Sequence, residues 1–432
     1  MNKIIDFLER HLVPVASKFG SQRHLVAIRD GFVAIMPLIL VGSLGMMINQ
    51  FQFPGYQDLM KSIFGVSASG APYFHSLGSF LWDATFGIMS LALCVALSYN
   101  LAKSYDSDAL AATLVSFASL ILVYEKATFF NFSGTTGLFV AILVSIVSTE
   151  LFVRLLRNKK LVIKMPDSVP PAVSRSFASI LPAFIVLILF GILKCILVTI
   201  GRPSLHLVVY DVIQAPLQGL AQGLGSAIIV ALIIHVLWFF GLHGPNIILP
   251  VTSALYTPAM EENMKLVAAG ENATNIITTS FFDNFVYLGG SGATIGLLIA
   301  IFIASRRRKS ALMAQYGAVS KVALGPGIFN INEPVVFGMP IVLNVRLLIP
   351  FLLTPIILVL TTYFAMTSGL VPLTYVQAHW TIPPIIGGAL TTNSIAGGIL
   401  AGINLLISIV IYLPFVFMGH DEKIITEESI SS

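Results

Sequence analysis

The stretch Gly325–Asn344, GPGIFNINEPVVFGMPIVLN, sets the interpretation of the whole sequence. It holds three glycines, three prolines, three asparagines and one acid, Glu333, with long apolar segments on both sides. Proline removes a backbone donor and disfavours a continuous helix, so this stretch predicts a broken element. At membrane depth, a broken backbone must face protein or a watery cavity, and a carboxylate there indicates a functional site. The alternative is a turn outside the membrane, although turns rarely carry so much aliphatic sequence on each flank.

The composition of the chain indicates a membrane protein. Of its 432 residues, 56% are hydrophobic and 10% are charged, whereas soluble domains are about one quarter charged. The net charge of +4 comes from basic residues at the ends of apolar segments, which indicates orientation in a bilayer rather than nucleic-acid binding. Cys94 and Cys195 both lie in apolar runs, so we expect no disulfide, no metal site and no cofactor.

Apolar segments, most of them close to the roughly 20 residues that a helix needs to cross hydrocarbon, recur along the chain. They lie near residues 25–48, 77–100, 110–124, 135–156, 176–200, 227–240, 293–305, 347–366 and 395–417. Pro245, Pro250 and Pro258 interrupt the apolar pattern that follows His243, and one further net crossing between Gly244 and Gly290 brings the total to about ten. The predicted fold is an all-α polytopic membrane protein with about ten transmembrane helices, two re-entrant hairpins and amphipathic helices near residues 4–19 and 205–224.

Basic residues predict the orientation of the spans. They precede the first span and follow the fourth, whereas the loop 51–74 holds a single lysine, Lys61. The excess of Lys and Arg marks cytoplasmic loops, so we expect a multi-pass protein of the cytoplasmic membrane with both termini in the cytoplasm. A basic, proline-rich linker at residues 160–175, or the polar stretch near Arg202, divides the chain. We take the halves as residues 1–201 and 202–432.

Two short segments of the second half are broken by glycine and proline and carry an ionisable residue, His243 in one and Glu333 in the other. Such interrupted segments are typical of transport sites. Imidazole, carboxylate and asparagine amide groups all hydrogen-bond hydroxyls, and Trp380 offers an apolar face for a sugar ring. A hydroxyl-rich solute therefore fits better than an inorganic cation. The alternatives are a core histidine for His243 and a membrane-interface residue for Trp380.

Three motifs resemble one known family. NINEPVVFGMPIVLN and GLHGPN are similar to signature motifs of the membrane-spanning IIC component of the bacterial phosphoenolpyruvate-dependent sugar phosphotransferase system, in its lactose/cellobiose (N,N'-diacetylchitobiose) branch. IRDGFVAIMPLILVGS resembles the opening helix of that branch, and the likeness covers nearly the whole chain. One departure is Val345, where many relatives place proline at the entry to the next helix.

The resemblance implies a homodimer whose contact is formed largely by the first five helices, with the sugar held in the second half. It also implies a separate cytosolic IIB subunit that carries a phosphocysteine, and indirectly a IIA protein. By resemblance, His243, Asn332 and Glu333 contact a disaccharide and Trp380 stacks on it. Asn246 and Asn330, from the same two motifs, complete the expected substrate-binding set. Glu333 is the candidate catalytic residue, which orients or deprotonates the sugar hydroxyl.

The predicted function is a IIC permease that carries a β-linked disaccharide by alternating access. Whether the chain counts as an enzyme stays open, because the phosphoryl donor would lie on a separate protein. One alternative is a proton- or sodium-coupled sugar transporter that uses Glu333 or His243. Another is a membrane-embedded transferase acting on a lipid-linked sugar, although the sequence shows no paired-acid motif or metal-ligand cluster. The sequence does not choose between cellobiose, diacetylchitobiose and lactose.

Overall fold

The computed structural model describes residues 21–50, 55–67, 73–163, 165–166, 169–307, 311–339 and 345–418, with Pro14, Lys18 and Ile341. The regular elements of these residues are all helices, which confirms the predicted all-α class. The amphipathic segment expected at residues 4–19 lies outside the described residues, apart from Pro14 and Lys18.

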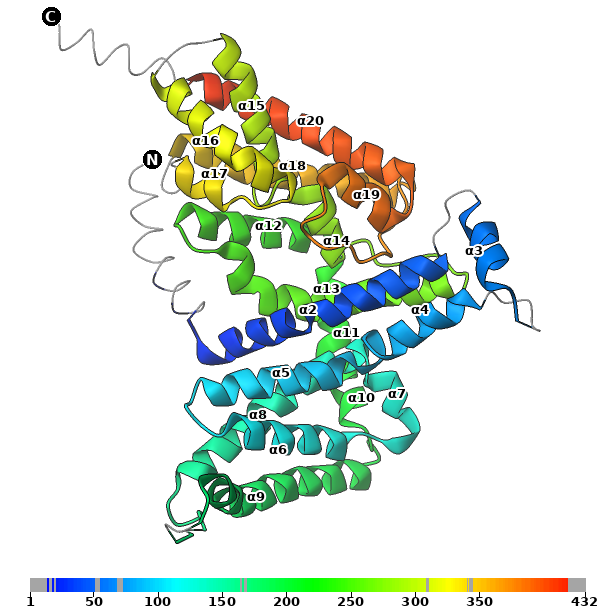
Figure 1. Cartoon of the computed structure of the whole chain (residues 1–432), viewed down its shortest axis with the longest axis vertical. Coiled ribbons are helices and arrows are strands. Elements are labelled where there is room, and N and C mark those ends of the chain that lie inside the picture. The colour runs from blue at the N-terminus through cyan, green and yellow to red at the C-terminus, as the bar shows by residue number, and fades with distance from the viewer. Residues whose placement is uncertain are drawn as a thin grey trace, which may run out of the picture.

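The first half contains α2 (Arg23–Gln50), α3 (Tyr56–Phe64), α4 (Phe74–Asp83), η1 (Phe86–Ile88), α5 (Met89–Lys103), α6 (Ala109–Val123), η2 (Lys126–Thr128), α7 (Phe129–Phe132), η3 (Thr135–Gly137), α8 (Leu138–Arg157) and α9 (Pro171–Thr199). The second half contains α10 (Leu205–Val209), η4 (Tyr210–Gln214), α11 (Ala215–Ala221), α12 (Leu224–Phe239), α13 (Gly244–Ala268), α14 (Thr279–Phe281), η5 (Phe282–Val286), α15 (Thr294–Arg307), α16 (Ala311–Ile328), α17 (Glu333–Gly338), α18 (Val345–Thr367), α19 (Pro384–Thr392) and α20 (Ile395–Met418). In Figure 1, α5–α10 lie at one end of the elongated molecule, α15–α20 lie at the other, and α2 crosses between them.

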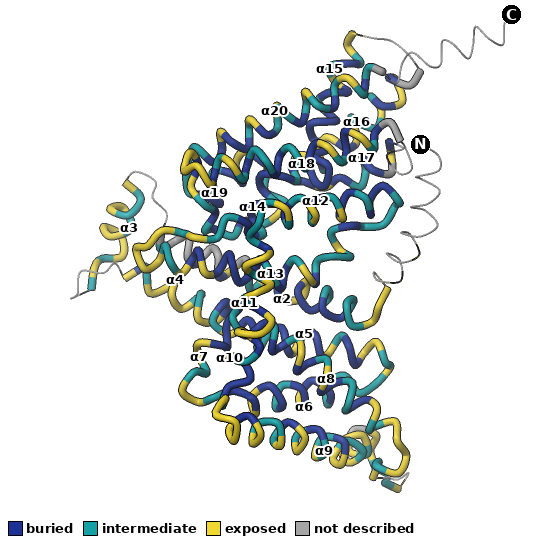
Figure 2. Tube along the Cα trace, turned by 180° about the vertical axis from the view of Figure 1, so that it is seen from behind, coloured by how far each residue is buried: buried dark blue, intermediate teal, exposed yellow. Residues whose placement is uncertain are grey.

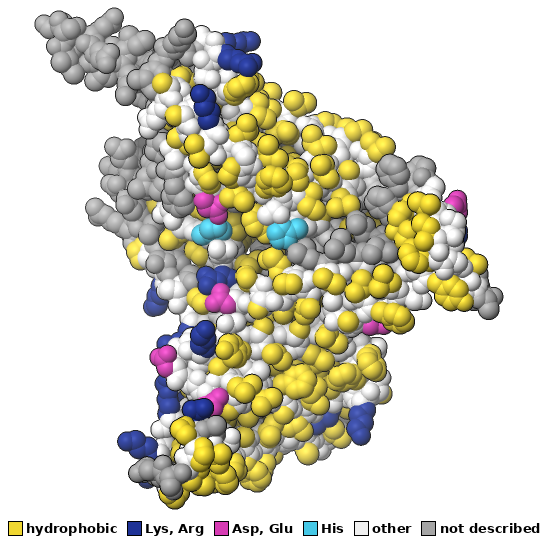
Figure 3. Space-filling model, viewed as in Figure 1, with side chains coloured by type: hydrophobic (Ala, Val, Ile, Leu, Met, Phe, Trp, Pro, Cys, Tyr) yellow, Lys and Arg dark blue, Asp and Glu magenta, His cyan; other side chains and the backbone are white. Residues whose placement is uncertain are grey.

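Five helical stretches of the described chain are long and apolar enough to cross a membrane. They are Phe74–Lys103, Thr135–Arg157, Val173–Thr199, Leu347–Thr367 and Ile395–Phe417. Two sharply bent pairs, Ala109–Val123 with Lys126–Phe132 and Leu205–Ala221 with Leu224–Phe239, raise the number to seven if each is one span. The polytopic membrane class is therefore confirmed. Figure 3 shows a face covered largely by hydrophobic side chains, as expected for a surface in contact with lipid.

Several prolines differ from expectation. The sequence predicts that Pro250, Pro258 and Pro326 break their helices, but the first two lie inside α13 and the third lies inside α16. Helices packed inside a membrane protein tolerate proline because neighbouring groups satisfy the freed carbonyls. The chain breaks instead at positions with positive φ, at Asn330 (φ 61°) and in the turn Gly289–Gly292. The break at Asn330 falls four residues, about one helical turn, after Pro326, whereas no proline lies near the turn Gly289–Gly292.

Figure 2 shows which positions along the chain are buried. The buried hydrophobic residues of the described chain form four clusters. One lies within α5, α6, α8 and α9 and also takes in Leu205 and Val209 of α10. Two lie in the second half, around Phe285 and around Trp238. The fourth joins α2 and α5 to Ala254, Met260 and Met264 of α13. The two halves therefore meet along α2 and α13.

Cys94 is buried and Cys195 is exposed, and both are free thiols that lie within helices.

A buried carboxylate also links the halves. Glu261 of α13 is 2% exposed and accepts a hydrogen bond from the backbone N–H of Thr135 in η3, at 3.2 Å. Its other partner is Lys265, one helical turn further on, whose Nζ lies 2.7 Å from Glu261 Oε1. The contact ties the helix that begins at His243 to the loop before α8.

We expect Glu261→Ala to lower the apparent Tm in detergent more than Glu262→Ala does. Removing Glu261 leaves the Thr135 N–H buried without a partner, which costs about 1–3 kcal/mol. Glu262 is exposed and accepts a hydrogen bond from the side chain of half-buried Asn275 at 2.9 Å, so its removal should be nearly neutral. Thermal unfolding followed by size-exclusion chromatography measures the difference. Equal shifts for the two variants would contradict a stabilising link at Glu261.

Candidate functional site

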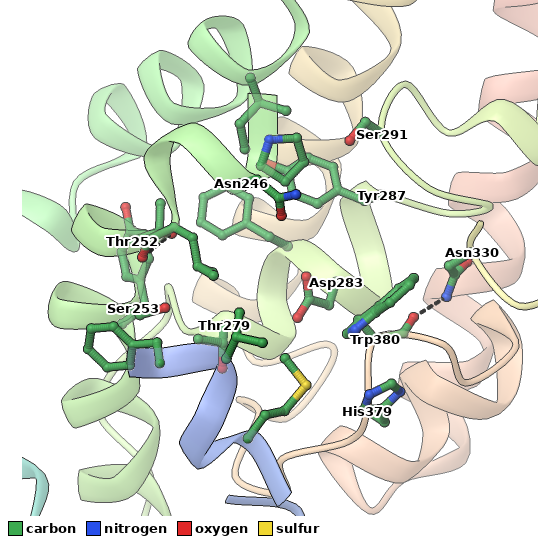
Figure 4. Close-up of a pocket in the computed structure, with 18 of the residues that line it drawn as sticks. Asn246, Thr252, Ser253, Thr279, Asp283, Tyr287, Ser291, Asn330, His379 and Trp380 are labelled. Atoms are coloured by element: carbon green, nitrogen blue, oxygen red, sulfur yellow. Dashed lines mark hydrogen bonds between the residues drawn. The ribbon is translucent and has the colours of Figure 1, made fainter. Parts of the chain in front are cut away.

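A cavity of about 470 Å³ opens where α2, α12, α13 and the broken helix α14–η5 meet. Its volume falls in the range of about 300–1,000 Å³ that is typical of small-molecule sites. The polar side chains in its lining include His243, Asn246, Thr252, Ser253, Thr279, Asp283, Ser291, Asn330, Asn332, Glu333, Gln377 and His379. Figure 4 shows several of them around the cavity.

All six residues that the sequence predicts for the site line this one cavity, although they come from three separate segments. His243 and Asn246 stand at the start of α13. Asn330 and Asn332 lie between α16 and α17, Glu333 is the first residue of α17, and Trp380 belongs to the loop before α19. The fold therefore brings the two broken segments together, as the sequence predicts. The last part of the signature stretch, Pro340 and residues 342–344, lies outside the described residues.

His243 and Glu333 form a pair at this cavity. The His243 Nδ1 accepts a hydrogen bond from the backbone N–H of Asn246, at 3.3 Å, so the neutral ring carries its proton on Nε2. That Nε2 lies 3.4 Å from Glu333 Oε1, with the two side chains 38% and 44% exposed. His243 is therefore partly exposed at the cavity and is not a buried core histidine. The hydrogen bond from His243 holds the pKa of the Glu333 carboxyl below its usual value, against the opposing effect of partial burial.

Asn330 is a buried connector. Its Oδ1 accepts from the backbone N–H of Gly289 at 2.6 Å, and its Nδ2 donates to the carbonyls of Trp380 at 2.5 Å and Ile382 at 2.9 Å. Both donors of the amide are therefore used within the protein. Asn330 thus positions the loop that carries Trp380, and its amide N–H groups are not available to a ligand in this conformation.

The turn Gly289–Gly292 is hydrogen-bonded by side chains from other segments of the chain. Its three glycines have φ between +79° and +95°, a region that favours glycine, and an added Cβ on Gly290 would lie 2.6 Å from Asn332. Asn332 Nδ2 donates to the Ser291 carbonyl at 3.0 Å. Fully buried His235 donates from Nδ1 to the Ala231 carbonyl, and its Nε2 accepts from the Gly292 N–H, both at 2.6 Å.

Trp380 is 39% exposed, and its indole lies along the cavity beside Asp283 in Figure 4. The Asn330 amide fixes its carbonyl, and the His379 ring lies 5.5 Å from its own ring. An aromatic face presented to a cavity suits a sugar ring better than a membrane interface. The position favours the predicted stacking role over the interfacial alternative.

Three contributors are missing from the sequence-based prediction. His235 and Tyr412, which donates to the Gly292 carbonyl at 2.6 Å, support the glycine turn from α12 and α20. Asp283 lines the cavity itself. His235 and Tyr412 sit inside apolar helices with no local motif. Asp283 lies among polar and aromatic residues between two broken segments, and this local pattern marks it as a possible cavity residue.

Three known proteins match this chain over nearly its whole length. The sequence pattern of the family described as "Phosphotransferase system, EIIC" matches residues 29–355. The cellobiose-specific EIIC component of Geobacillus stearothermophilus is 38% identical, over 99% of this chain and 97% of that protein. The lichenan permease IIC component of Bacillus subtilis is 38% identical, over 100% and 96%. The crystal structure of the transporter ChbC, the IIC component from the N,N'-diacetylchitobiose-specific phosphotransferase system, matches with a TM-score of 0.90 and 37% identity, over 98% and 99%.

We expect Asn330→Ala to lower both stability and sugar affinity, and Asn246→Ala to lower sugar affinity alone. Asn330→Ala leaves one N–H and two carbonyls without their partner, at about 1–3 kcal/mol for each buried group, so both the apparent Tm and cellobiose affinity should fall. The side chain of Asn246 is exposed at the cavity, so Asn246→Ala should lower affinity and leave the Tm unchanged. Titration calorimetry and thermal unfolding on the same samples separate the two. A Tm loss for Asn246→Ala alone would reverse the assignment.

Proposed function

The chain belongs to the EIIC family of the phosphotransferase system, and we propose that it moves a β-linked disaccharide across the cytoplasmic membrane and presents it for phosphorylation. It is a multi-pass sugar permease of the cellobiose, chitobiose and lactose type. EIIC components take sugars as substrates and act with IIB and IIA proteins. The positions of basic residues favour both termini in the cytoplasm.

The observation that carries the proposal is the His243–Glu333 pair in one cavity with Trp380. A stacking face and a hydrogen-bonding carboxylate are the two elements that a pyranose ring needs. The Glu333 side chain is partly exposed and lines the cavity, so its carboxylate is accessible to a ligand there. Two half-exposed polar side chains that are paired with each other offer hydrogen bonds to a ligand at little desolvation cost.

In the proposed reaction, the sugar hydroxyl oxygen attacks the phosphorus of the IIB phosphocysteine. The O–P bond forms, the S–P bond breaks, and the cysteine leaves as a thiolate. Glu333 accepts the hydroxyl proton, while the Nε2–H of His243 holds the carboxylate in place. Alignment of the attacking oxygen supplies most of the rate. Cys94 and Cys195 lie inside helices, so the phosphocysteine belongs to the partner protein.

Residues from both halves surround the cavity, but they differ in kind. The first half contributes apolar side chains, Phe32, Val33, Met36, Ile39 and Phe86. All six predicted site residues belong to the second half. This division supports alternating access in which the second half (residues 202–432) carries the sugar past an apolar wall. The first half (residues 1–201) then serves as the fixed, dimerising scaffold, and we include a homodimer in the proposal.

We expect Glu333→Gln to bind cellobiose within about tenfold of the wild type, because glutamine keeps one hydrogen-bond acceptor. Its phosphorylation-linked uptake should fall by about 10²–10⁴, the usual contribution of a general base. Uptake is measured in vesicles that contain IIB, IIA and the upstream phosphoryl donors. Glu262→Gln, outside the cavity, is the control. Full uptake by Glu333→Gln would eliminate the base role.

We expect the labelled disaccharide to arrive phosphorylated, and its uptake to stop when phosphoenolpyruvate is omitted. The reason is that the proposed transfer consumes a phosphoryl group for each sugar delivered. Thin-layer chromatography of the vesicle contents measures this. Accumulation of free sugar driven by a proton or sodium gradient would instead support an ion-coupled transporter.

A further inference from the structure

Within the described part of the chain, the Asp283 carboxylate has no hydrogen-bond or ion-pair partner. It belongs to η5, the π-helical turn after α14, and it lines the cavity. Glu333, the other acid among the described lining residues, is by contrast paired with His243. Lys and Arg are absent from the described lining of the cavity. Asp283 is only partly exposed, and a partly buried carboxylate without a partner is unfavourable, so it is suited to an external partner in the cavity.

The surroundings of Asp283 are fixed rather than adaptable. The Thr279 hydroxyl, one helical turn earlier, donates to Gln377 Oε1 at 2.5 Å. The rings of Phe282 and Tyr287 stack with centroids 5.6 Å apart. In Figure 4, Asp283 points into the middle of the cavity, next to the indole of Trp380. The Asp283 carboxylate therefore lies beside the Trp380 indole in the cavity.

The chemistry of this arrangement selects among ligands. A carboxylate accepts hydrogen bonds on both oxygens, so adjacent hydroxyls of one ring can donate to it together. A bare cation would require more oxygen ligands of negative charge, and the described residues hold no cluster of three or more metal-binding side chains. An apolar solute would leave the carboxylate unpaired. A stacked sugar ring satisfies both the indole face and the acid beside it.

We propose that Asp283 is a sugar-binding residue that accepts hydrogen bonds from hydroxyls of the ring stacked on Trp380. Glu333 and His243 hold the hydroxyl that receives the phosphoryl group, so the two acids have different tasks. The inference rests on the proposed function and deepens it. It assigns affinity for the sugar to Asp283 and reactivity to Glu333.

The test is titration calorimetry of the full-length protein in detergent with cellobiose, diacetylchitobiose and lactose. Asp283→Asn should bind the preferred sugar about 10- to 100-fold more weakly, because the amide accepts on one oxygen only and its NH₂ faces the second donor hydroxyl. Its apparent Tm without sugar should be unchanged or higher, because no protein partner is lost. Asp211→Asn, at an exposed ion pair with Arg202 outside the cavity, is the control and should bind as the wild type does.

Three results would overturn the inference. The first is Asp283→Asn binding with wild-type affinity. The second is a lower Tm for both Asp283→Asn and Asp283→Ser, or failure of both to fold, which indicates a structural role. The third is wild-type binding that requires sodium together with Asp283→Asn binding that does not, which indicates a cation site. A wild type that binds none of the three sugars would refute the proposed function itself, a separate result.

Discussion

The constraint on which the site depends is that backbone polar groups outside a helix must find partners when water is excluded. The turn Gly289–Gly292 is such a break, and side chains satisfy it from three directions. Asn330 and Asn332 bind it from the segment before α17, His235 from α12 and Tyr412 from α20. Each of these bonds joins elements that are distant in the sequence. The broken backbone is therefore the point at which the second half is tied together.

This arrangement explains how rigid positioning coexists with an open cavity. Both N–H donors of the Asn330 amide bind carbonyls in the loop of Trp380, so the Trp380 indole is positioned relative to the turn Gly289–Gly292. Glu333 follows three residues later, at the first position of α17, where its side chain reaches His243. The ligand-facing groups therefore rest on a second set of polar contacts that are satisfied within the protein. The first half adds an apolar wall, and α2 packing on α13 sets where that wall stands.

The sequence predicts the class and the membrane setting from composition, and its short motifs select six residues that line one cavity. It does not separate the asparagines by task. Asn246 faces the cavity, whereas the Asn330 amide is fully hydrogen-bonded within the protein. Only the tertiary structure, which supplies these partners, distinguishes the two roles. Pro250 and Pro258 mislead because neighbouring helices, which a linear pattern does not show, allow α13 to continue through them. His235 lacks any local signal, since its partner Gly292 lies 57 residues away.

In the proposed function, the Glu333 carboxylate, supported by this network, holds the sugar hydroxyl that receives the phosphoryl group. A structure of the chain with cellobiose bound tests it most directly. We predict one sugar hydroxyl within hydrogen-bond distance of the Glu333 carboxylate, with a ring stacked on Trp380. A disaccharide that lies elsewhere, or one that fills the cavity without contacting Glu333, would contradict the account.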